Sequence, residues 1–137
     1  MNDTFENPVF DIAMAYQDTA ALIAAVRLDL FTKIGLETVS VDDLQSRTGA
    51  AARGLRILCD YLTVLKLLQK TDSKYSLTYV ARTFLDQASP YAMGSVVDFA
   101  AAPEMIELFF RDPAACVRSG GSDGLANVSP DAPVWVR

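Results

Sequence analysis

The 137-residue sequence contains no histidine and only two cysteines, and these absences narrow the chemistry open to it. Cys59 and Cys116 lie far apart, without the C-x-x-C spacing of a redox pair or of a zinc ligand set. Histidine is the commonest general base, and no constellation of carboxylate, lysine or tyrosine side chains convincingly replaces it. We therefore predict no catalytic residues and no metal site in this chain.

Glycine-rich nucleotide loops are also missing. The sequence has no G-x-G-x-x-G, no P-loop and no G-x-S-x-G pattern, so we predict no cofactor-binding residues. Glu104 and Glu107 lie three residues apart on one expected helix face. Such an acidic pair is more typical of a solvated face than of paired carboxylates in catalysis.

Long apolar runs are scarce as well. We find no run that approaches the roughly 18–20 residues of a membrane helix, and we expect no membrane contact. The first eleven residues carry Asp3, Glu6 and Asp11 and no base, unlike the basic start of a secretory signal. We expect a cytoplasmic protein.

Charge is unevenly placed along the chain, although the net charge is only −5. Residues 1–46 hold eight acids and two bases, and residues 83–137 hold seven acids and three bases. Residues 47–82 hold two acids and seven bases, and we call this segment the basic island. Its bases are Arg47, Arg53, Arg56, Lys66, Lys70, Lys74 and Arg82.

The segment Asp11–Ile34 contains no glycine or proline and is dense in alanine and leucine, which predicts one helix over these residues. Apolar residues nearly encircle that helix, so we expect it to be buried on more than one side and to need a partner on its second face. Gly35 is expected to end it, because glycine takes a left-handed backbone at little cost.

Two further helices are predicted after an extended piece at Val39. Ser40 followed by Asp43 can cap a helix that runs to Thr48. The next helix, from Ala51 to Leu67, carries an apolar stripe. The stripe consists of Leu55, Leu58, Leu62 and Leu65, and we expect Cys59 to be a buried free thiol beside it.

Residues 67–71 and 74–78 predict a β-hairpin that turns at Asp72-Ser73. Thr78 can cap a following helix, which should stop before Ser89-Pro90. The order of three helices, a hairpin and a helix is that of a winged-helix unit. We therefore predict a mainly α, winged-helix-like fold with a small hairpin.

Three more helices are predicted at residues 91–101, 103–110 and 112–118. In residues 119–133, eleven of fifteen positions are Ser, Gly, Asp, Asn or Pro, which indicates a linker. The apolar residues 134–137 then begin a new element, as expected of a chain cut short. We divide the chain into a domain at 1–118 and, at 119–137, a linker with the start of a further domain.

A bulky apolar group lies on the later helices: Phe99, Met105, Phe109 and Phe110. Such spacing usually reflects core packing. The alternative is a hydrophobic wall for a planar acceptor molecule, because ligand pockets are mostly apolar and often lie between domains.

The basic island allows a second function, that of a DNA-binding winged-helix regulator. Arg53 and Arg56 would lie on its recognition helix, and Lys70 and Lys74 on its wing. The acidic flanks and the pI of about 4.5 argue against it.

Four segments in order resemble the N-terminal domain of small-molecule O-methyltransferases that use S-adenosylmethionine. They are AALIAAVRLDLFTKI (20–34), TVSVDDLQSRTG (38–49), GLRILCDYLTVLKLLQK (54–70) and KYSLTYVARTFL (74–85). The resemblance covers about residues 12–118, and winged-helix regulators share parts of it.

The resemblance implies that the first helix and the late helices interlock with a second copy in an intertwined homodimer. The expected interface residues are Ile12, Tyr16, Ile23 and Val26. It also implies that residues 93–110 help to cover the acceptor pocket of a C-terminal catalytic domain, with Phe99, Met105, Phe109 and Phe110 as lining residues for a small aromatic or polyketide-like acceptor. S-adenosylmethionine would bind that domain, so this chain alone should be non-catalytic and should not bind the cofactor.

Overall fold

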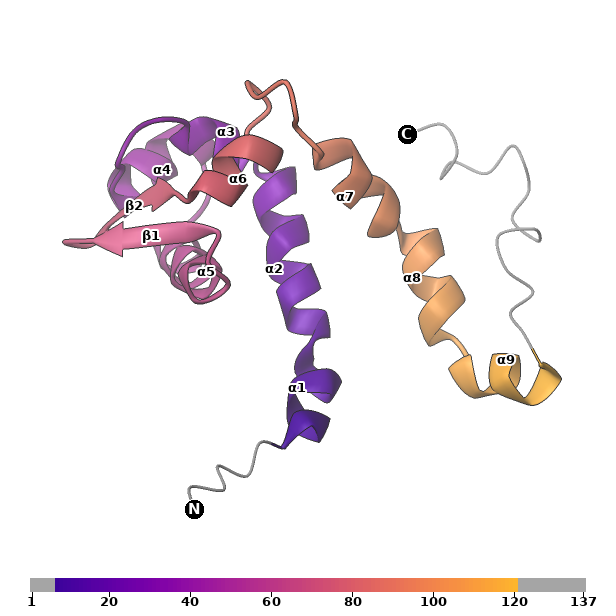
Figure 1. The fold of residues 1–137 in the computed structure, drawn as a ribbon. Helices are drawn as coiled ribbons and strands as arrows, with labels where there is room; N and C mark the ends of the chain where they lie inside the picture. The colour runs from indigo at the N-terminus through magenta and orange to yellow at the C-terminus, as the bar shows by residue number, and fades with distance from the viewer. Residues whose placement is uncertain (1–6, 121–137) are drawn as a thin grey trace, which may run out of the picture. The chain divides into compact units, whose positions relative to one another are not determined.

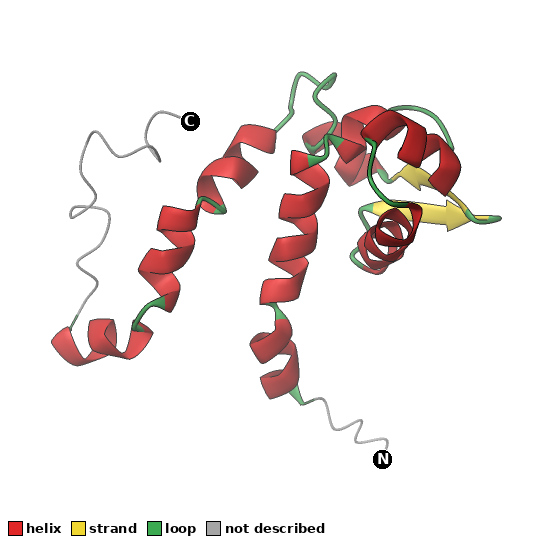
Figure 2. Ribbon diagram, turned by 180° about the vertical axis from the view of Figure 1, so that it is seen from behind, coloured by secondary structure: helices red, strands yellow, loops and turns green. Residues whose placement is uncertain are grey.

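The computed structural model describes residues 7–120, which fall into two compact units that divide between Ala92 and Met93. Within the described residues the chain is mainly helical with one small antiparallel hairpin, as predicted (Figures 1 and 2). The first unit contains α1 (Pro8–Met14), α2 (Tyr16–Arg27), α3 (Leu30–Ile34), α4 (Val41–Thr48), α5 (Ala52–Val64), β1 (Leu68–Thr71), β2 (Lys74–Leu77) and α6 (Tyr79–Phe84). The second contains α7 (Gly94–Ala100), α8 (Pro103–Phe110) and α9 (Pro113–Ser119).

The prediction of one helix over residues 11–34 is wrong, because three helices occupy this stretch and the first begins at Pro8. A short turn at Ala15 separates α1 from α2 while the backbone stays right-handed (φ −57°, ψ −23°). The larger break is at Asp29, whose φ of 52° is left-handed. Aspartate tolerates this conformation better than most residues. The break re-aims the chain so that Leu30, Phe31 and Ile34 all enter the core.

The predicted capping box is confirmed at the start of α4. Ser40 Oγ accepts a hydrogen bond of 3.1 Å from the backbone N–H of Asp43, and the Asp43 carboxylate accepts one of 2.8 Å from the Ser40 N–H. Gly49 ends the helix with a left-handed backbone (φ 74°). The next helix, α5, ends at Val64 and not at Leu67 as predicted, because Lys66 takes a positive φ of 60° before the chain enters β1.

The hairpin pairs β1 with β2 in antiparallel register, with Leu68 opposite Leu77. Its two turn residues, Asp72 and Ser73, have φ values of 47° and 64°, as a tight two-residue reversal requires. A third short piece joins it, since Val39 and Tyr75 exchange backbone hydrogen bonds of 2.9 and 2.8 Å. The extended residue predicted at Val39 is therefore confirmed.

The core of the first unit lies where α2, α3, α4, α5 and the hairpin meet. Leu55 and Leu62 of the predicted α5 stripe are buried, and Leu58 and Leu65 pack against them. Thr78 caps α6 by accepting from the Ala81 N–H at 3.3 Å, as predicted, and Ala81 closes the core on that side.

In the second unit, α8 begins at Pro103 and α9 is capped by Asp112, whose Oδ1 accepts from the Ala115 N–H at 3.0 Å. The helix expected at 91–101 is shorter than predicted, because α7 begins only at Gly94. The linker predicted from residue 119 begins too early, since Ser119 is still helical. Residues 121–133 of the predicted linker and the apolar end at 134–137 lie outside the described residues. The division into domains at 1–118 and 119–137 stays a prediction.

Candidate functional site

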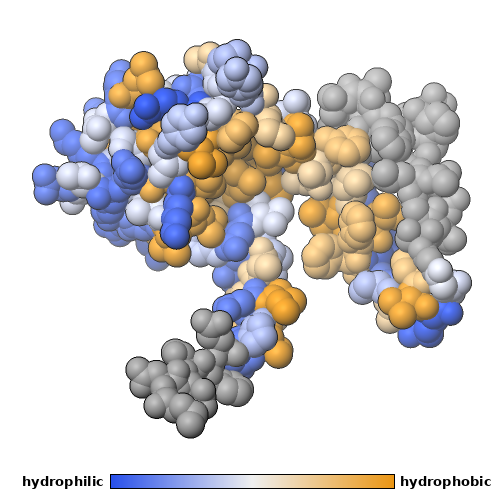
Figure 3. Space-filling view, in the orientation of Figure 1, coloured by the Kyte–Doolittle hydropathy of each residue, from blue (hydrophilic) through white to orange (hydrophobic). Residues whose placement is uncertain are grey.

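The most unusual surface of the first unit is the apolar helical pair α1–α2. No residue of α1 is buried, and Ala25 is the one buried residue of α2. The side chains of Val9, Phe10 and Ile12 are 70%, 68% and 74% exposed. Figure 3 shows apolar surface at the α1 end of this unit. Removing apolar side chains of this size from water lowers the free energy of the system. This surface is therefore suited to contact with another apolar surface.

The four predicted interface residues all lie on this helical pair. Ile12 and Tyr16 are exposed, whereas Ile23 and Val26 are half-buried, and Val26 also packs against the core. The helical period places these residues on one side of α1–α2. Their role in an interface stays a prediction.

Together, α1 and α2 give the one segment among the described residues, Pro8–Arg27, that is long and apolar enough to cross a membrane by length and composition alone. The expectation that no apolar stretch reaches this length is therefore wrong for this segment. An apolar helix of a water-soluble protein meets the same criterion.

A second apolar feature is a groove between α2 and α5, with a volume of about 320 Å³. Gln17 and Ala21 of α2 form one wall. The α5 wall consists of Gly54, Ile57, Leu58 and Tyr61. At its rim, Tyr61 Oη donates a 2.5 Å hydrogen bond to Asp18 Oδ1, which raises the pKa of Tyr61 above its usual value. Sequence reasoning missed this groove, because the apolar stripe of α5 was assigned to the core alone.

Two bases of the basic island form ion pairs with carboxylates of the same unit. Arg47 forms an ion pair of 2.5 Å with Glu37 and donates to the backbone carbonyl of Lys33 at 2.7 Å. Lys70 forms an ion pair of 2.6 Å with Asp60. The Lys70 ammonium and the Tyr75 hydroxyl both donate to that carboxylate, and they hold the pKa of Asp60 below its usual range. A cation held in this way is less available to a phosphate, so the structure does not favour the DNA-binding alternative.

The predicted lining residues all lie in the second unit, on α7 and α8. Phe99 and Met105 are half-buried, whereas Phe109 and Phe110 are 64% and 69% exposed. The exposed pair is not core, so core packing accounts for only part of this group. Whether the four residues line an acceptor pocket stays a prediction.

The acidic pair of α8 borders a small hollow of about 220 Å³, together with Leu108 and Arg111. Glu107 forms an ion pair with Arg111 one helical turn later. This pairing fits the predicted solvated face better than acid–base chemistry.

Beside α6, the first unit has another hollow, of about 400 Å³, that sequence reasoning did not anticipate. Leu36, Tyr79, Arg82 and Tyr91 contribute to its walls. Asp86 lies at its edge and is buried, but its Oδ1 accepts from the Ala88 N–H at 2.9 Å and so shapes the loop.

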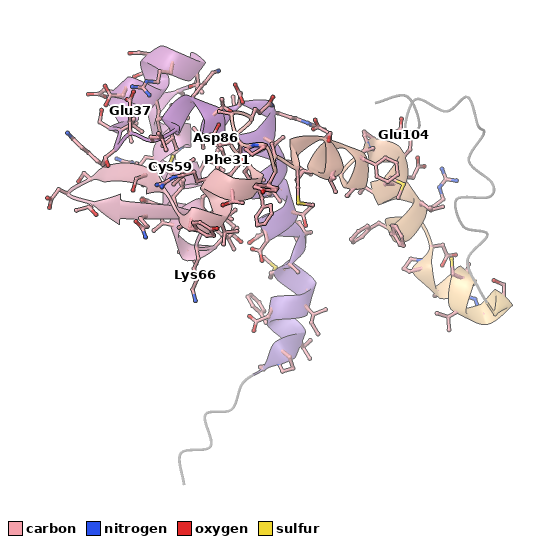
Figure 4. All side chains as sticks on the ribbon, turned by 45° about the horizontal axis from the view of Figure 1, so that its top comes forward. Phe31, Glu37, Cys59, Lys66, Asp86 and Glu104 are labelled. Atoms are coloured by element: carbon pink, nitrogen blue, oxygen red, sulfur yellow. The ribbon has the colours of Figure 1, made fainter. Side chains whose placement is uncertain are left out.

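Cys59 is fully buried in the core, as predicted. Burial raises the pKa of its thiol to about 12, so the reactive thiolate is scarce at neutral pH. Figure 4 shows Cys59 and Phe31 within the first unit, with Lys66 pointing away from it.

Comparison with known proteins identifies the family. The model of the O-methyltransferase dimerisation domain matches residues 10–87, which include α2 to α6. The tetracenomycin polyketide synthesis 8-O-methyl transferase TcmO of Streptomyces glaucescens is 33% identical over 87 residues, which are 63% of this chain and 26% of that protein.

Two crystal structures agree with this match. A Nostoc punctiforme protein named as an O-methyltransferase has 35% identity and a TM-score of 0.85, over 97% of this chain and 41% of that one. An O-methyltransferase family 2 protein from Planctomyces limnophilus, crystallised with apigenin, has 30% identity and a TM-score of 0.64, over 76% of this chain and 32% of that one. This chain spans less than half the length of these relatives. It belongs to the O-methyltransferase dimerisation domain family.

Proposed function

We propose that this chain is the dimerisation and acceptor-lining part of a small-molecule O-methyltransferase that uses S-adenosylmethionine, and that it is itself non-catalytic. The observation that carries the proposal is the uncovered apolar surface of α1–α2 in a chain of the dimerisation family. The partner is a second copy of the same chain.

The energetics support a protein partner for this surface. Val9, Phe10 and Ile12 are each more than two-thirds exposed. Full burial of such a side chain is worth about 1.5–3 kcal/mol. In a homodimer, each of these side chains that the contact covers is buried once on each protomer, and this burial offsets the cost of association.

Sedimentation equilibrium of the 137-residue chain tests dimerisation. We expect a dimer at micromolar concentration, and a monomer at high micromolar concentration would overturn this part of the proposal. Calorimetric titration with S-adenosylmethionine tests the non-catalytic part, for which we expect no heat of binding. Saturable binding would show that this chain holds a cofactor site.

The acceptor-lining role rests on Phe109 and Phe110, which expose apolar rings on α8. The name of TcmO refers to polyketide synthesis, and the Planctomyces limnophilus protein was crystallised with apigenin. Both support a small aromatic or polyketide-like acceptor. Phe99 and Met105 would form the half-buried base of the same wall.

An NMR titration with apigenin tests the lining role. We expect shifts of the Met105 methyl signal and of the Phe109 and Phe110 ring signals. The methyl signals of Val117, which is 82% exposed on α9, serve as the control. Shifts confined to Val117 or to the first unit, or no shifts at all, would contradict the assignment.

A further inference from the structure

The groove between α2 and α5 is continuous with a face of α1 that the predicted interface does not use. Gln17 and Ala21 line the groove one turn apart. Counting back by the helical period of 3.6 residues places Met14 and Phe10 on the same face. Ala15, at the junction, keeps right-handed backbone angles, so the period carries through from α2 to α1. We call Phe10, Met14, Gln17, Ala21 and the α5 wall of the groove the groove face.

The groove face contains an exposed aromatic side chain, Phe10, and an apolar hollow, the groove between α2 and α5. Phe10 lies on α1, which has no buried residue, and its side chain is 68% exposed. The groove has a volume of about 320 Å³ and apolar walls from Ala21, Ile57 and Leu58. A cavity of about 150 Å³ can hold a benzene ring, so the groove has room for a phenylalanine ring.

The Phe10 ring cannot reach the groove of its own chain while α1 remains helical. Phe10 and Gln17 are seven residues apart on nearly straight helices, which separates them by about 10 Å along the axis. The groove extends from Gln17 away from Phe10, toward Ala21. The ring and the groove can therefore meet only between two molecules.

The distribution of charge allows this face to meet a copy of itself. Residues 1–46 are strongly acidic, yet Phe10, Met14, Gln17 and Ala21 carry no charge. Asp18 lies beside the groove, and its Oδ1 already accepts from the Tyr61 hydroxyl at 2.5 Å. Two copies of the face can therefore approach without opposing like charges, which would otherwise disfavour a self-complementary contact.

We propose that Phe10 of each protomer inserts into the α2–α5 groove of a second copy, with the two α1–α2 pairs antiparallel and the two-fold axis near Met14. In this arrangement Phe10 lies opposite Gln17 of the partner, because the two positions are equally distant from the axis. The contact is isologous: the same ring and the same groove are used twice. The inference rests on the proposed dimerisation and specifies which surfaces meet.

In this arrangement the small residues Gly54 and Ala21 keep the groove wide enough for the partner's ring. A side chain larger than theirs would narrow the groove from both walls, and a Cβ at Gly54 would meet no atom of its own chain within 4 Å. Ile57, which is 55% exposed, would be covered by the partner's ring. α1, which is too short to be stable as an isolated helix, would gain the packing that it lacks within one chain.

Cysteine cross-linking tests the pairing of Phe10 with the groove. Phe10→Cys and Ile57→Cys chains are prepared separately in a Cys116→Ser background, with the buried Cys59 retained. Mild oxidation of the mixed chains should give a cross-linked heterodimer in high yield, and each variant alone should give little product. Met14→Cys alone should cross-link efficiently, because its two copies lie near the axis.

Leu36→Cys is the matched control, since Leu36 is 81% exposed in the same unit and lies away from the groove face. Efficient cross-linking of Phe10→Cys chains to one another would overturn the proposed pairing. So would a cross-linked yield for Phe10→Cys mixed with Leu36→Cys that equals the yield for Phe10→Cys mixed with Ile57→Cys. If the unmodified chain sediments as a monomer, the proposed dimerisation fails as well. If it is a dimer and the mixture does not cross-link, only the assignment of the groove fails.

Equilibrium measurements give a second, independent readout. We expect Phe10→Ala to weaken the dimer by about tenfold or more, as truncation of a buried aromatic anchor does. Gly54→Leu should weaken it similarly, because it fills the groove from the α5 side. Helical content by circular dichroism monitors folding of each variant. An unchanged dimer constant in both folded variants would contradict the proposal.

Discussion

Tyr75 Oη donates a 2.7 Å hydrogen bond to Asp60 Oδ1 and thereby ties the hairpin to α5. The ring of Tyr75 is almost completely buried, at 1% exposure. Lys70 Nζ donates to the same oxygen at 2.6 Å and lies 5.3 Å from the centre of the Tyr75 ring. Part of the basic island is thus a structural link between strand and helix.

Tyr75→Phe should lower the free energy of unfolding by about 1–2 kcal/mol, because it leaves the ring in place and removes one hydrogen bond to a charged acceptor. Urea denaturation at pH 7 measures the change. Tyr79→Phe is the control, since Tyr79 is 79% exposed, and it should have no effect.

The effect of Tyr75→Phe should depend on pH. The pKa of Asp60 is lowered in the folded state, so its contribution is present above the unfolded pKa and is lost as the pH falls through the folded pKa. The difference between the unmodified chain and Tyr75→Phe should therefore shrink in acid. A difference that stays constant from neutral pH down to that range would contradict this account.

Removal of the α4 cap by Ser40→Ala should cost about 1 kcal/mol of stability. Thermal unfolding monitored by circular dichroism measures it. Ser46→Ala is the control on the same helix, because Ser46 Oγ only donates back to the Asp42 carbonyl at 3.0 Å. Equal losses for the two variants would show that the cap is not the cause.

The hydrogen bonds from Ser40 also lower the pKa of Asp43. The capping box should therefore weaken as the pH falls through that lowered pKa. An NMR titration of the Asp43 side-chain carbonyl signal should give a pKa below the ordinary aspartate value in the unmodified chain, and Ser40→Ala should move it back toward that value.

Gly35→Ala should destabilise the first unit by about 1 kcal/mol or more, because the backbone at this position has a positive φ of 56°, which strains any residue with a Cβ. Gly94→Ala is the matched control, since its backbone is not left-handed and a Cβ there meets nothing within 4 Å. Chemical denaturation compares the two. A Gly35→Ala variant as stable as Gly94→Ala would refute the strain argument.

Thiol labelling should distinguish the two cysteines by their reactivity. Cys59 is fully buried and its thiol has a pKa of about 12, whereas Cys116 is half-buried on α9. We expect a disulfide reagent at pH 8 to label one thiol per native chain and two in denaturant. Cys116→Ser should abolish the fast native reaction, and a fast reaction that persists would show that the core around Cys59 opens readily.

Met14→Asp should weaken the proposed dimer by about tenfold or more, because it places a charge on the groove face beside the proposed two-fold axis. Sedimentation equilibrium measures the dimer constant. Leu36→Asp provides the control, as Leu36 is 81% exposed outside α1–α2. Similar weakening by both substitutions would point to net charge and not to a specific surface.

Local signals in the sequence determined most of the secondary structure. Ser40 with Asp43, Thr78 with Ala81, and Asp112 with Ala115 each place a helix start, because a cap is a contact between residues two or three apart. The spacing of Leu55 and Leu62 identified the buried side of α5 for the same reason. The family resemblance read from residues 20–85 was also correct.

Tertiary structure decided what depends on residues far apart in the chain. The break at Asp29 has no glycine or proline signal, and it occurs because Leu30 and Phe31 must enter a core built by α4, α5 and the hairpin. The ion pair of Lys70 with Asp60 joins two elements, and no charge count along the sequence could separate it from a free base. The groove likewise exists only because the fold packs α2 beside α5, which brings Ala21 and Gly54 to opposite walls of one hollow. Helical periodicity and helix caps depend on residues that are close in the sequence, so the sequence alone determines them. The break at Asp29, the ion pair and the groove depend on which distant side chains the whole fold brings together.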